Sequence, residues 1–137
     1  MPDEKLDLAP LERAIDRLNE GWDRYQRGGS ETRSRRGLIQ RFEFTYEISH
    51  KMLKRYLEFA SATPEEYDGM HFQDLIRSGN EQGLLLGTWP NWKDYRDMRS
   101  KTSHTYNEEL ALEVVAGIPA FSNEAGYLRD QIKARLA

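Results

Sequence analysis

Apolar side chains recur every three to four residues along most of this chain, and glycine, proline and capping residues separate the apolar segments. This spacing is typical of amphipathic helices, in which positions three and four apart share a face. No segment shows the alternating pattern with paired turns that predicts a β-hairpin. We therefore predict an all-α protein, an antiparallel up-and-down bundle of four to five helices that forms a single domain over residues 1–137.

The first two predicted helices have clear boundary signals. Pro10 can occupy a first helical turn, and the apolar stripe that follows it continues as far as Gly28. A second helix is predicted from about residue 32 to 61, and the small residues Thr45 and Ser49 continue its apolar stripe.

Two helices are predicted in the middle of the chain. Thr63, followed by proline and two glutamates, is a helix-start signal and predicts a third helix to Ser78. A glycine-rich stretch follows, and a fourth helix is predicted to begin at Trp89 and to reach Thr102.

The C-terminal part predicts two more helical segments. Thr105 and Glu108 have the spacing of a capping box, which predicts that Thr105 caps the next helix. Pro119 is expected to end that helix, and a last amphipathic segment is predicted from about Ala120 to Leu136.

Composition narrows the class of protein. Aromatic residues make up 11% of the chain, which argues against disorder although charged residues make up 31%. The chain has no cysteine, so disulfides and thiolate-bound metals are excluded, and it has no glycine-rich phosphate loop or H-E-x-x-H helix. We predict no cofactor and no metal.

Charge and hydropathy bear on location and partners. The net charge of −3 gives no overall attraction to nucleic acid, so an RNA contact has to come from a local basic patch. No segment approaches the roughly 18 apolar residues of a membrane span, and the first residues do not resemble a signal peptide. We expect a cytoplasmic protein.

Two of the three histidines have simple interpretations. His71 is expected to be structural or exposed. His50 shares a helical stripe with Glu43, Glu47 and Lys54, which is typical of a solvated charged face. Glu47 and His50 supply only a pair of metal ligands, so a metal site is disfavoured.

The stretch R-S-K-T-S-H-T-Y at 99–106 has two interpretations. A histidine can exchange a proton near neutral pH and an arginine can bind a phosphate, which are the groups that metal-free RNA cleavage needs. Arg99 and His104 lie about 140° apart on a helix, so they border one groove, and two copies across a two-fold axis would form a phosphate site. Alternatively, Arg99, Lys101 and His104 simply face the helix dipole, and spacing alone favours that interpretation.

A second basic cluster precedes the second helix. Arg33, Arg35 and Arg36 could hold phosphates, but a solvated helix start is the more common explanation of such a cluster.

Three stretches carry a resemblance to a known family. They are G-L-I-Q-R-F-E-F-T-Y-E at 37–47, K-M-L-K-R-Y-L at 51–57 and T-S-H-T-Y-N-E at 102–108. Together they resemble the HEPN superfamily, in particular its HepT-like branch, also called nucleotidyltransferase substrate-binding proteins. The resemblance extends over about residues 10 to 135.

The resemblance implies a helical homodimer in which the R-x4-6-H motifs of both subunits meet in a cleft. It implies Arg99 and His104 as the catalytic pair of a metal-independent endoribonuclease, and a minimal nucleotidyltransferase as partner and antitoxin. The motif extends to H-x-Y, which implies Tyr106 as the acceptor of AMP that blocks the cleft. This chain has Ser100 where the family often has asparagine or another strongly polar residue.

Four residues are predicted to support the site: Ser100, Ser103, Glu43 and Glu47. For the two glutamates, support of the cleft and simple exposure to solvent both remain open. Three hypotheses of function follow. The first is a HepT-like toxin that cleaves RNA, the second a non-catalytic substrate- or nucleotide-binding subunit of a two-component nucleotidyltransferase, and the third a helical interaction module in which His104 is only a cap.

Overall fold

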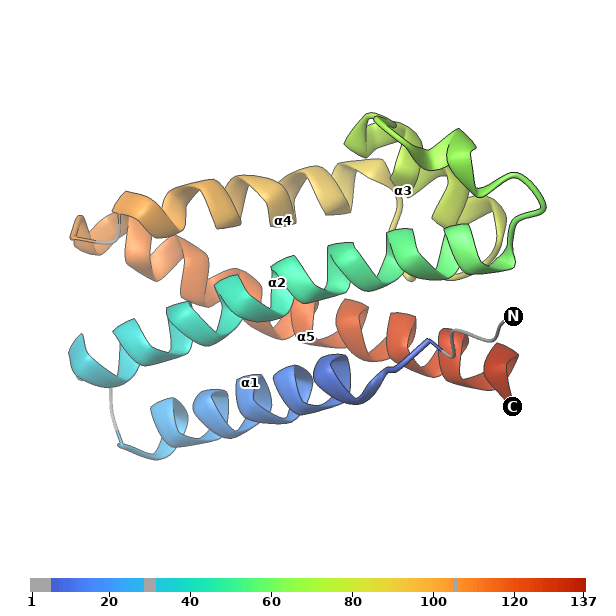
Figure 1. Cartoon of the computed structure of the whole chain (residues 1–137). Coiled ribbons are helices and arrows are strands. Elements are labelled where there is room, and N and C mark those ends of the chain that lie inside the picture. Colours follow the sequence, from blue (N-terminus) through green and yellow to red (C-terminus); the bar gives the residue numbers. More distant parts are fainter. Residues whose placement is uncertain (1–5, 29–31, 105) are drawn as a thin grey trace.

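Four helices form the antiparallel bundle seen in the computed structural model, which describes residues 6–28, 32–104 and 106–137 (Figure 1). Successive bundle helices run in opposite directions, which confirms the predicted all-α up-and-down architecture. A shorter fifth helix, α3, packs at one end of the bundle. The helices are α1 (Ala9–Gly28), α2 (Thr32–Ala60), α3 (Phe72–Glu81), α4 (Trp89–Lys101) and α5 (Glu108–Leu136).

α1 and α2 begin and end within a residue of the predicted boundaries, because local signals define them. The small residues predicted to continue the stripe of α2 are fully buried, and they let α1 approach α2 closely. The Thr45 hydroxyl lies 2.7 Å from the Arg41 carbonyl oxygen and 3.2 Å from that of Ala14, so it has acceptors on both helices.

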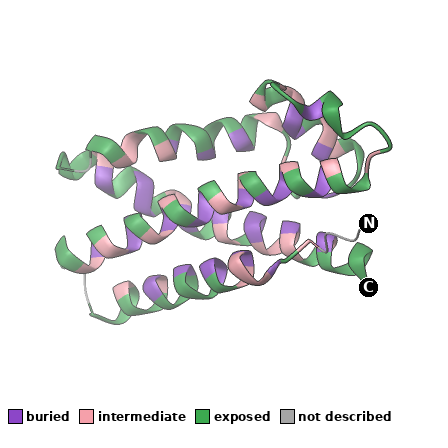
Figure 2. Cartoon of the chain, in the orientation of Figure 1, coloured by how far each residue is buried: buried purple, intermediate pink, exposed green. Residues whose placement is uncertain are grey.

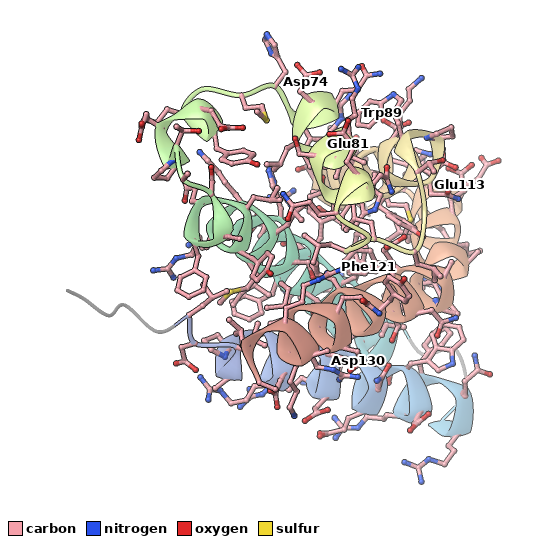
Figure 3. The ribbon with its side chains drawn as sticks, turned by 90° about the vertical axis from the view of Figure 1, so that its right-hand side faces the viewer. Asp74, Glu81, Trp89, Glu113, Phe121 and Asp130 are labelled. Atoms are coloured by element: carbon pink, nitrogen blue, oxygen red, sulfur yellow. The ribbon has the colours of Figure 1, made fainter. Side chains whose placement is uncertain are left out.

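An aromatic cluster fills the core between α2, α4 and α5. Phe121 of α5 has no exposed surface and points into the interior when the bundle is viewed from its end (Figure 3). Its ring meets Phe42 and Tyr95 edge-on, each at 5.2 Å between centroids. Buried positions line the inner faces of the helices and exposed ones the outside (Figure 2), as the apolar stripes predict.

The predicted third helix is wrong in its extent. Residues 64–67 form only a short 3₁₀ helix, η1 (Pro64–Tyr67), and α3 starts separately after His71. Gly69 has a φ of 67°, which an α-helix cannot accommodate, so the chain turns there. The helix-start signal at Thr63 was correct, but glycine ends the helix within two turns.

The prediction that Pro119 ends a helix is wrong. α5 continues through it, and the two predicted C-terminal segments are one helix of 29 residues. Proline removes one backbone hydrogen bond, but Ile118 and Phe121 on either side are buried, and this burial outweighs the loss. Pro119 itself is exposed, and the ribbon of α5 changes direction part-way along its length (Figure 1).

The residue that caps α5 is Asn107, whose side-chain oxygen accepts a hydrogen bond from the Leu110 N–H at 3.2 Å. The predicted capping box on Thr105 is therefore wrong; Thr105 itself lies outside the described residues. Asparagine and threonine are both good caps, and the choice between them depends on where the chain leaves α4.

A buried carboxylate holds the loop between α3 and α4 against α5. Glu124 has no exposed surface, and its two oxygens accept hydrogen bonds from the backbone N–H groups of Leu86 and Gly87 at 2.7 and 2.8 Å. A β-carbon on Gly87 would lie 2.8 Å from a Glu124 oxygen, so only glycine permits this approach. Burial raises the pKa of Glu124, and the two N–H donors oppose that rise.

Candidate functional site

Arg99 lies in the last turn of α4, with its side chain directed at α2. Its Nη1 lies 3.0 Å from a carboxylate oxygen of Glu43. Its Nη2 and Nε donate to one oxygen of Glu47 at 2.6 and 3.1 Å. All three guanidinium nitrogens are therefore engaged by two acids that lie one turn apart on α2.

Thr102 joins this network. It is the first residue of η2 (Thr102–His104), a short 3₁₀ helix that continues α4. Its hydroxyl accepts a hydrogen bond from Arg99 Nη1 at 3.2 Å and lies 3.1 Å from a Glu43 oxygen. The sequence predicted Thr102 only as the end of the fourth helix and gave it no role in the site, although its place two residues before the histidine of the motif was a usable signal.

Glu43 and Glu47, for which the sequence left two interpretations open, both contact Arg99. Their side chains keep exposed fractions of 36% and 56%, so water still reaches the site. The hydrogen bond to Glu47 and the charges of both acids raise the pKa of Arg99 above its usual value, against a smaller effect of burial. Arg99 is a permanent cation here, with its charge balanced by two carboxylates.

His104 lies at the end of η2 and is exposed, in contrast to the anchored Arg99. The Tyr106 ring is 89% exposed, and its centroid lies 6.4 Å from that of His104. The histidine and the tyrosine therefore project together from the α4–α5 connection, where a large ligand can reach both.

The two serines named as supporting residues, Ser100 on α4 and Ser103 on η2, are both exposed. The connection that carries them is held to α5 by an ion pair of 3.1 Å between Lys101 and Glu113. Lys101 therefore has a partner other than the helix dipole.

The arginine cluster at the start of α2 is divided in the structure. Arg35 is buried and lies 3.6 Å from Glu108 in the first turn of α5, so it joins two helices. Arg33 and Arg36 are exposed. Burial of Arg35 contradicts the interpretation of the whole cluster as a solvated helix start, whereas Arg33 and Arg36 are free to meet solvent or a ligand.

Neither of the other histidines forms a metal site. His50 is half-buried, with its ring centroid 4.6 Å from that of Phe72, and burial lowers its pKa, with a smaller contribution from Lys54. His71 is exposed at the N-cap of α3. Within residues 6–28, 32–104 and 106–137, no three histidine, aspartate or glutamate side chains are grouped as metal ligands. No helix in these ranges is both long and apolar enough to span a membrane.

Comparison with known proteins agrees with this architecture. Residues 6–134 match the family described as "Nucleotidyltransferase substrate binding protein like". The chain is 41% identical over 99 residues to the "Probable ribonuclease HepT" of Haemophilus influenzae. The aligned region covers 72% of this chain and 67% of that protein. The chain belongs to the HepT-like nucleotidyltransferase substrate-binding family.

Two solved structures resemble this HepT-like chain in fold. One, from Haemophilus influenzae, is described as having the fold of a substrate-binding domain of a nucleotidyltransferase. Its TM-score with this chain is 0.86 and its sequence identity is 34%, and the match covers 93% of this chain and 99% of the Haemophilus chain. A protein of Thermus thermophilus has a TM-score of 0.65 and 30% identity and covers 92% of this chain and 98% of its own.

Proposed function

We propose that this HepT-like chain is the toxin of a toxin–antitoxin pair and an endoribonuclease that needs no metal. His104 is the general acid or base and Arg99 binds the phosphate. One observation carries the proposal: an anchored arginine lies in the last turn of α4, and an exposed histidine follows five residues later at the end of η2. Similarity to a protein named as a probable ribonuclease supports the same activity.

The chemistry requires only groups that this site supplies. The 2′-hydroxyl of the RNA attacks the adjacent phosphorus as a base removes its proton, and the bond to the 5′-oxygen breaks as that oxygen takes up a proton. The products are a 2′,3′-cyclic phosphate and a 5′-hydroxyl. His104 serves one proton transfer, and Arg99 stabilises the charge that develops on the phosphorus oxygens.

A second copy of the chain supplies the other proton-transfer group. One subunit has a single exposed histidine at this end of its described residues, whereas the reaction needs a base and an acid on opposite sides of the phosphate. A homodimer with two-fold symmetry brings both histidines and both arginines to one cleft. Mixing wild-type and His104→Ala subunits tests this arrangement, because a mixed dimer keeps only one of the two histidines and should lose cleavage.

The direct test uses purified protein, labelled RNA and EDTA. We expect cleavage to persist in EDTA and to fall at least about a hundredfold in His104→Ala, the usual contribution of general acid–base catalysis. His71→Ala is the matched control, because that histidine is exposed but lies at the start of α3. Cleavage that requires a divalent metal, or that survives His104→Ala, would contradict the proposal.

We also propose that a minimal nucleotidyltransferase is the antitoxin and that it transfers AMP from ATP to the Tyr106 hydroxyl, with release of pyrophosphate. The 89% exposure of Tyr106 and its position beside His104 support this role, since an added anion there occupies the space of the RNA phosphate. We expect the mass of wild-type protein to rise by AMP on incubation with the partner enzyme and ATP, while Tyr106→Phe stays unmodified and active. Modification of the partly exposed Tyr127 instead would contradict the assignment.

A second candidate function is a non-catalytic subunit that presents a substrate or nucleotide to a nucleotidyltransferase. The pairing of Arg99 with both Glu43 and Glu47 favours it, because a fully paired guanidinium is less available to a phosphate. This alternative predicts no RNA cleavage at any protein concentration, together with weaker binding of the nucleotidyltransferase by Arg99→Ala.

A further inference from the structure

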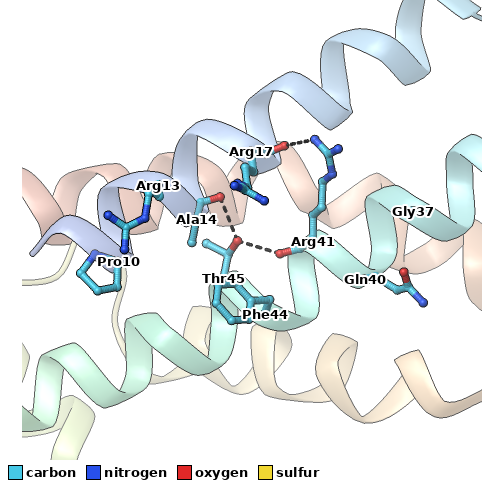
Figure 4. Close-up of a pocket in the computed structure, with 9 residues that line it drawn as sticks. All are labelled: Pro10, Arg13, Ala14, Arg17, Gly37, Gln40, Arg41, Phe44 and Thr45. Carbon is cyan, nitrogen blue, oxygen red and sulfur yellow. Dashed lines mark hydrogen bonds between the residues drawn. The ribbon is translucent and has the colours of Figure 1, made fainter.

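A groove runs between α1 and α2, on the side of α2 away from α4. Its volume is about 530 Å³, within the usual range of ligand sites. Figure 4 shows arginine side chains of α1 facing a phenylalanine and a glutamine of α2 across it. The nine lining residues are Pro10, Arg13, Ala14, Arg17, Gly37, Gln40, Arg41, Phe44 and Thr45.

The groove is basic although the chain is acidic overall. Arg13, Arg17 and Arg41 line it, and none of its nine lining residues is acidic. The acidic residues of α1 are absent from that lining. Among the described residues, none of these three arginines forms an ion pair with a carboxylate. The groove therefore carries a local positive charge that the net charge of −3 conceals.

Arg41 is fixed in place, whereas the two arginines of α1 are exposed. Its Nη1 donates to the Arg17 carbonyl oxygen at 2.6 Å, and its side chain packs against Gly21, where a β-carbon would come within 3.0 Å of it. Arg13 and Arg17 lie one turn apart on α1, so both can contact successive anionic groups. The groove thus has a rigid cationic wall and two adaptable cationic side chains.

The positive surface continues toward the start of α2. A second hollow of about 520 Å³ shares Gly37 and Gln40 with the first and adds Thr32, Arg33 and Arg36. Its lining also contains no acidic residue. Together the two hollows form a continuous track along α2, longer than a single phosphate requires.

An aromatic ring lies in the same groove. Phe44 is 57% exposed, although Phe42 on the same helix has no exposed surface. Phe44 directly follows Glu43, which contacts Arg99. α2 therefore presents the Phe44 ring to the groove on one face and the candidate site on the neighbouring face. An exposed ring beside guanidinium groups is the combination that binds single-stranded nucleic acid, in which phosphates pair with cations and a base stacks on the ring.

We infer that the groove between α1 and α2 binds single-stranded RNA, with phosphates on Arg13 and Arg17 and a base stacked on Phe44. The inference rests on the proposed ribonuclease function, and it names where the substrate is held outside the reacting site. RNA that crosses α2 at Phe44 reaches Arg99 beside the neighbouring face of that helix, a path of about one helix diameter, roughly 10 Å.

The test measures RNA binding apart from cleavage. His104→Ala protein is titrated into a fluorescein-labelled single-stranded RNA of about 12 nucleotides, and anisotropy gives Kd at several salt concentrations. In this background we compare three variants: the double variant Arg13→Gln/Arg17→Gln, Phe44→Ala and Phe44→Tyr. The matched control combines Arg55→Gln with Lys93→Gln, which removes the same charge from exposed positions outside the groove.

We expect the double arginine variant to raise Kd about tenfold and to reduce the salt slope by about 1.4, the loss of two phosphate contacts on a single strand. Phe44→Ala should raise Kd about tenfold with the slope unchanged, and Phe44→Tyr should restore binding because stacking needs only a ring. The control pair should change Kd less than about threefold. In the cleavage assay on wild-type His104, the groove variants should raise KM and leave kcat unchanged.

Three results would overturn the inference. The first is that the double arginine variant and Phe44→Ala both bind RNA with wild-type affinity. The second is that the control pair loses as much RNA affinity as these variants do. The third is a change of oligomeric state in Phe44→Ala, measured by sedimentation, which assigns the groove to a contact between copies of the chain. Failure of the proposed function has a different signature: no variant cleaves RNA, whether or not the groove binds it.

Discussion

The contacts of the Arg99 guanidinium determine how readily this side chain can bind a phosphate. Its three guanidinium nitrogens contact Glu43 and Glu47, and its Nη1 also donates to Thr102. These contacts hold the side chain in one orientation, but a phosphate must displace at least one carboxylate to reach it. Under the proposed function, the two glutamates position Arg99 and also compete with the RNA phosphate.

Glu47→Gln tests this competition. The amide keeps a hydrogen-bond acceptor for Arg99 but removes one negative charge, so a phosphate should bind more easily. We expect KM for RNA to fall about 1.4- to fivefold, as loss of an exposed ion pair of roughly 0.2–1 kcal/mol implies, with little change in kcat. Glu65→Gln, an exposed acid on η1, is the control for charge. A higher KM would mean that orientation of Arg99 matters more than competition.

His50 should make the stability of the protein depend on pH. Burial lowers its pKa below the ordinary 6.5, so the unfolded chain binds the proton more tightly. The stability that His50 contributes is present above pH 6.5 and is lost as the pH falls through the lower pKa of the folded state.

We expect the free energy of unfolding, measured with urea, to decrease as the pH falls from about 7 to about 5, with His50 contributing at most about 1.4 kcal/mol per pH unit. His50→Gln should reduce that slope, while the same change at the exposed His71 should not. An equal slope in wild type and His50→Gln would exclude His50 as the cause.

At the scale of elements, the success of sequence prediction depends on how local each signal is. α1 and α2 were predicted closely because proline, glycine and periodicity lie within the segments themselves. α5 passes Pro119 because burial of its neighbours decides, and burial depends on helices distant in sequence. The motif is local, and it predicted Arg99 and His104 as candidates. Spacing did not predict that Arg99 contacts two acids far earlier in the chain, because Glu47 lies 52 residues away.

Glu124 tests an element-scale claim, that α5 holds the α3–α4 loop. The sequence carried a signal, since Glu124 lies on the stripe of Phe121 and Leu128, both buried. Glutamine at this position supplies one oxygen for two N–H donors, so one donor loses its partner. We expect Glu124→Gln to reduce the free energy of unfolding by about 1–3 kcal/mol in urea titrations.

Glu109→Gln is the control for Glu124→Gln, because Glu109 is exposed in the first turn of α5. A Glu124→Gln protein as stable as wild type would mean that the loop is held by Leu84 and Leu85, which are buried, and not by the carboxylate.

At the scale of the whole molecule, the features concentrate around α2. On the α4 side its glutamates hold Arg99, and on the α1 side Phe44 and the arginines line the basic groove. The chain as a whole is acidic, so the proposed function requires that RNA is attracted only where these basic side chains face solvent. The bundle supplies rigidity, and the α4–α5 connection supplies the exposed groups.

The chemical nature of the RNA ends tests the central claim most directly. Wild-type protein is incubated with a short labelled RNA in EDTA, and the products are identified by mass spectrometry. We expect a 2′,3′-cyclic phosphate and a 5′-hydroxyl, and no cleavage where the 2′-hydroxyl at the cut site is replaced by hydrogen. A 5′-phosphate product, or cleavage of the 2′-deoxy substrate, would contradict the roles of Arg99 and His104.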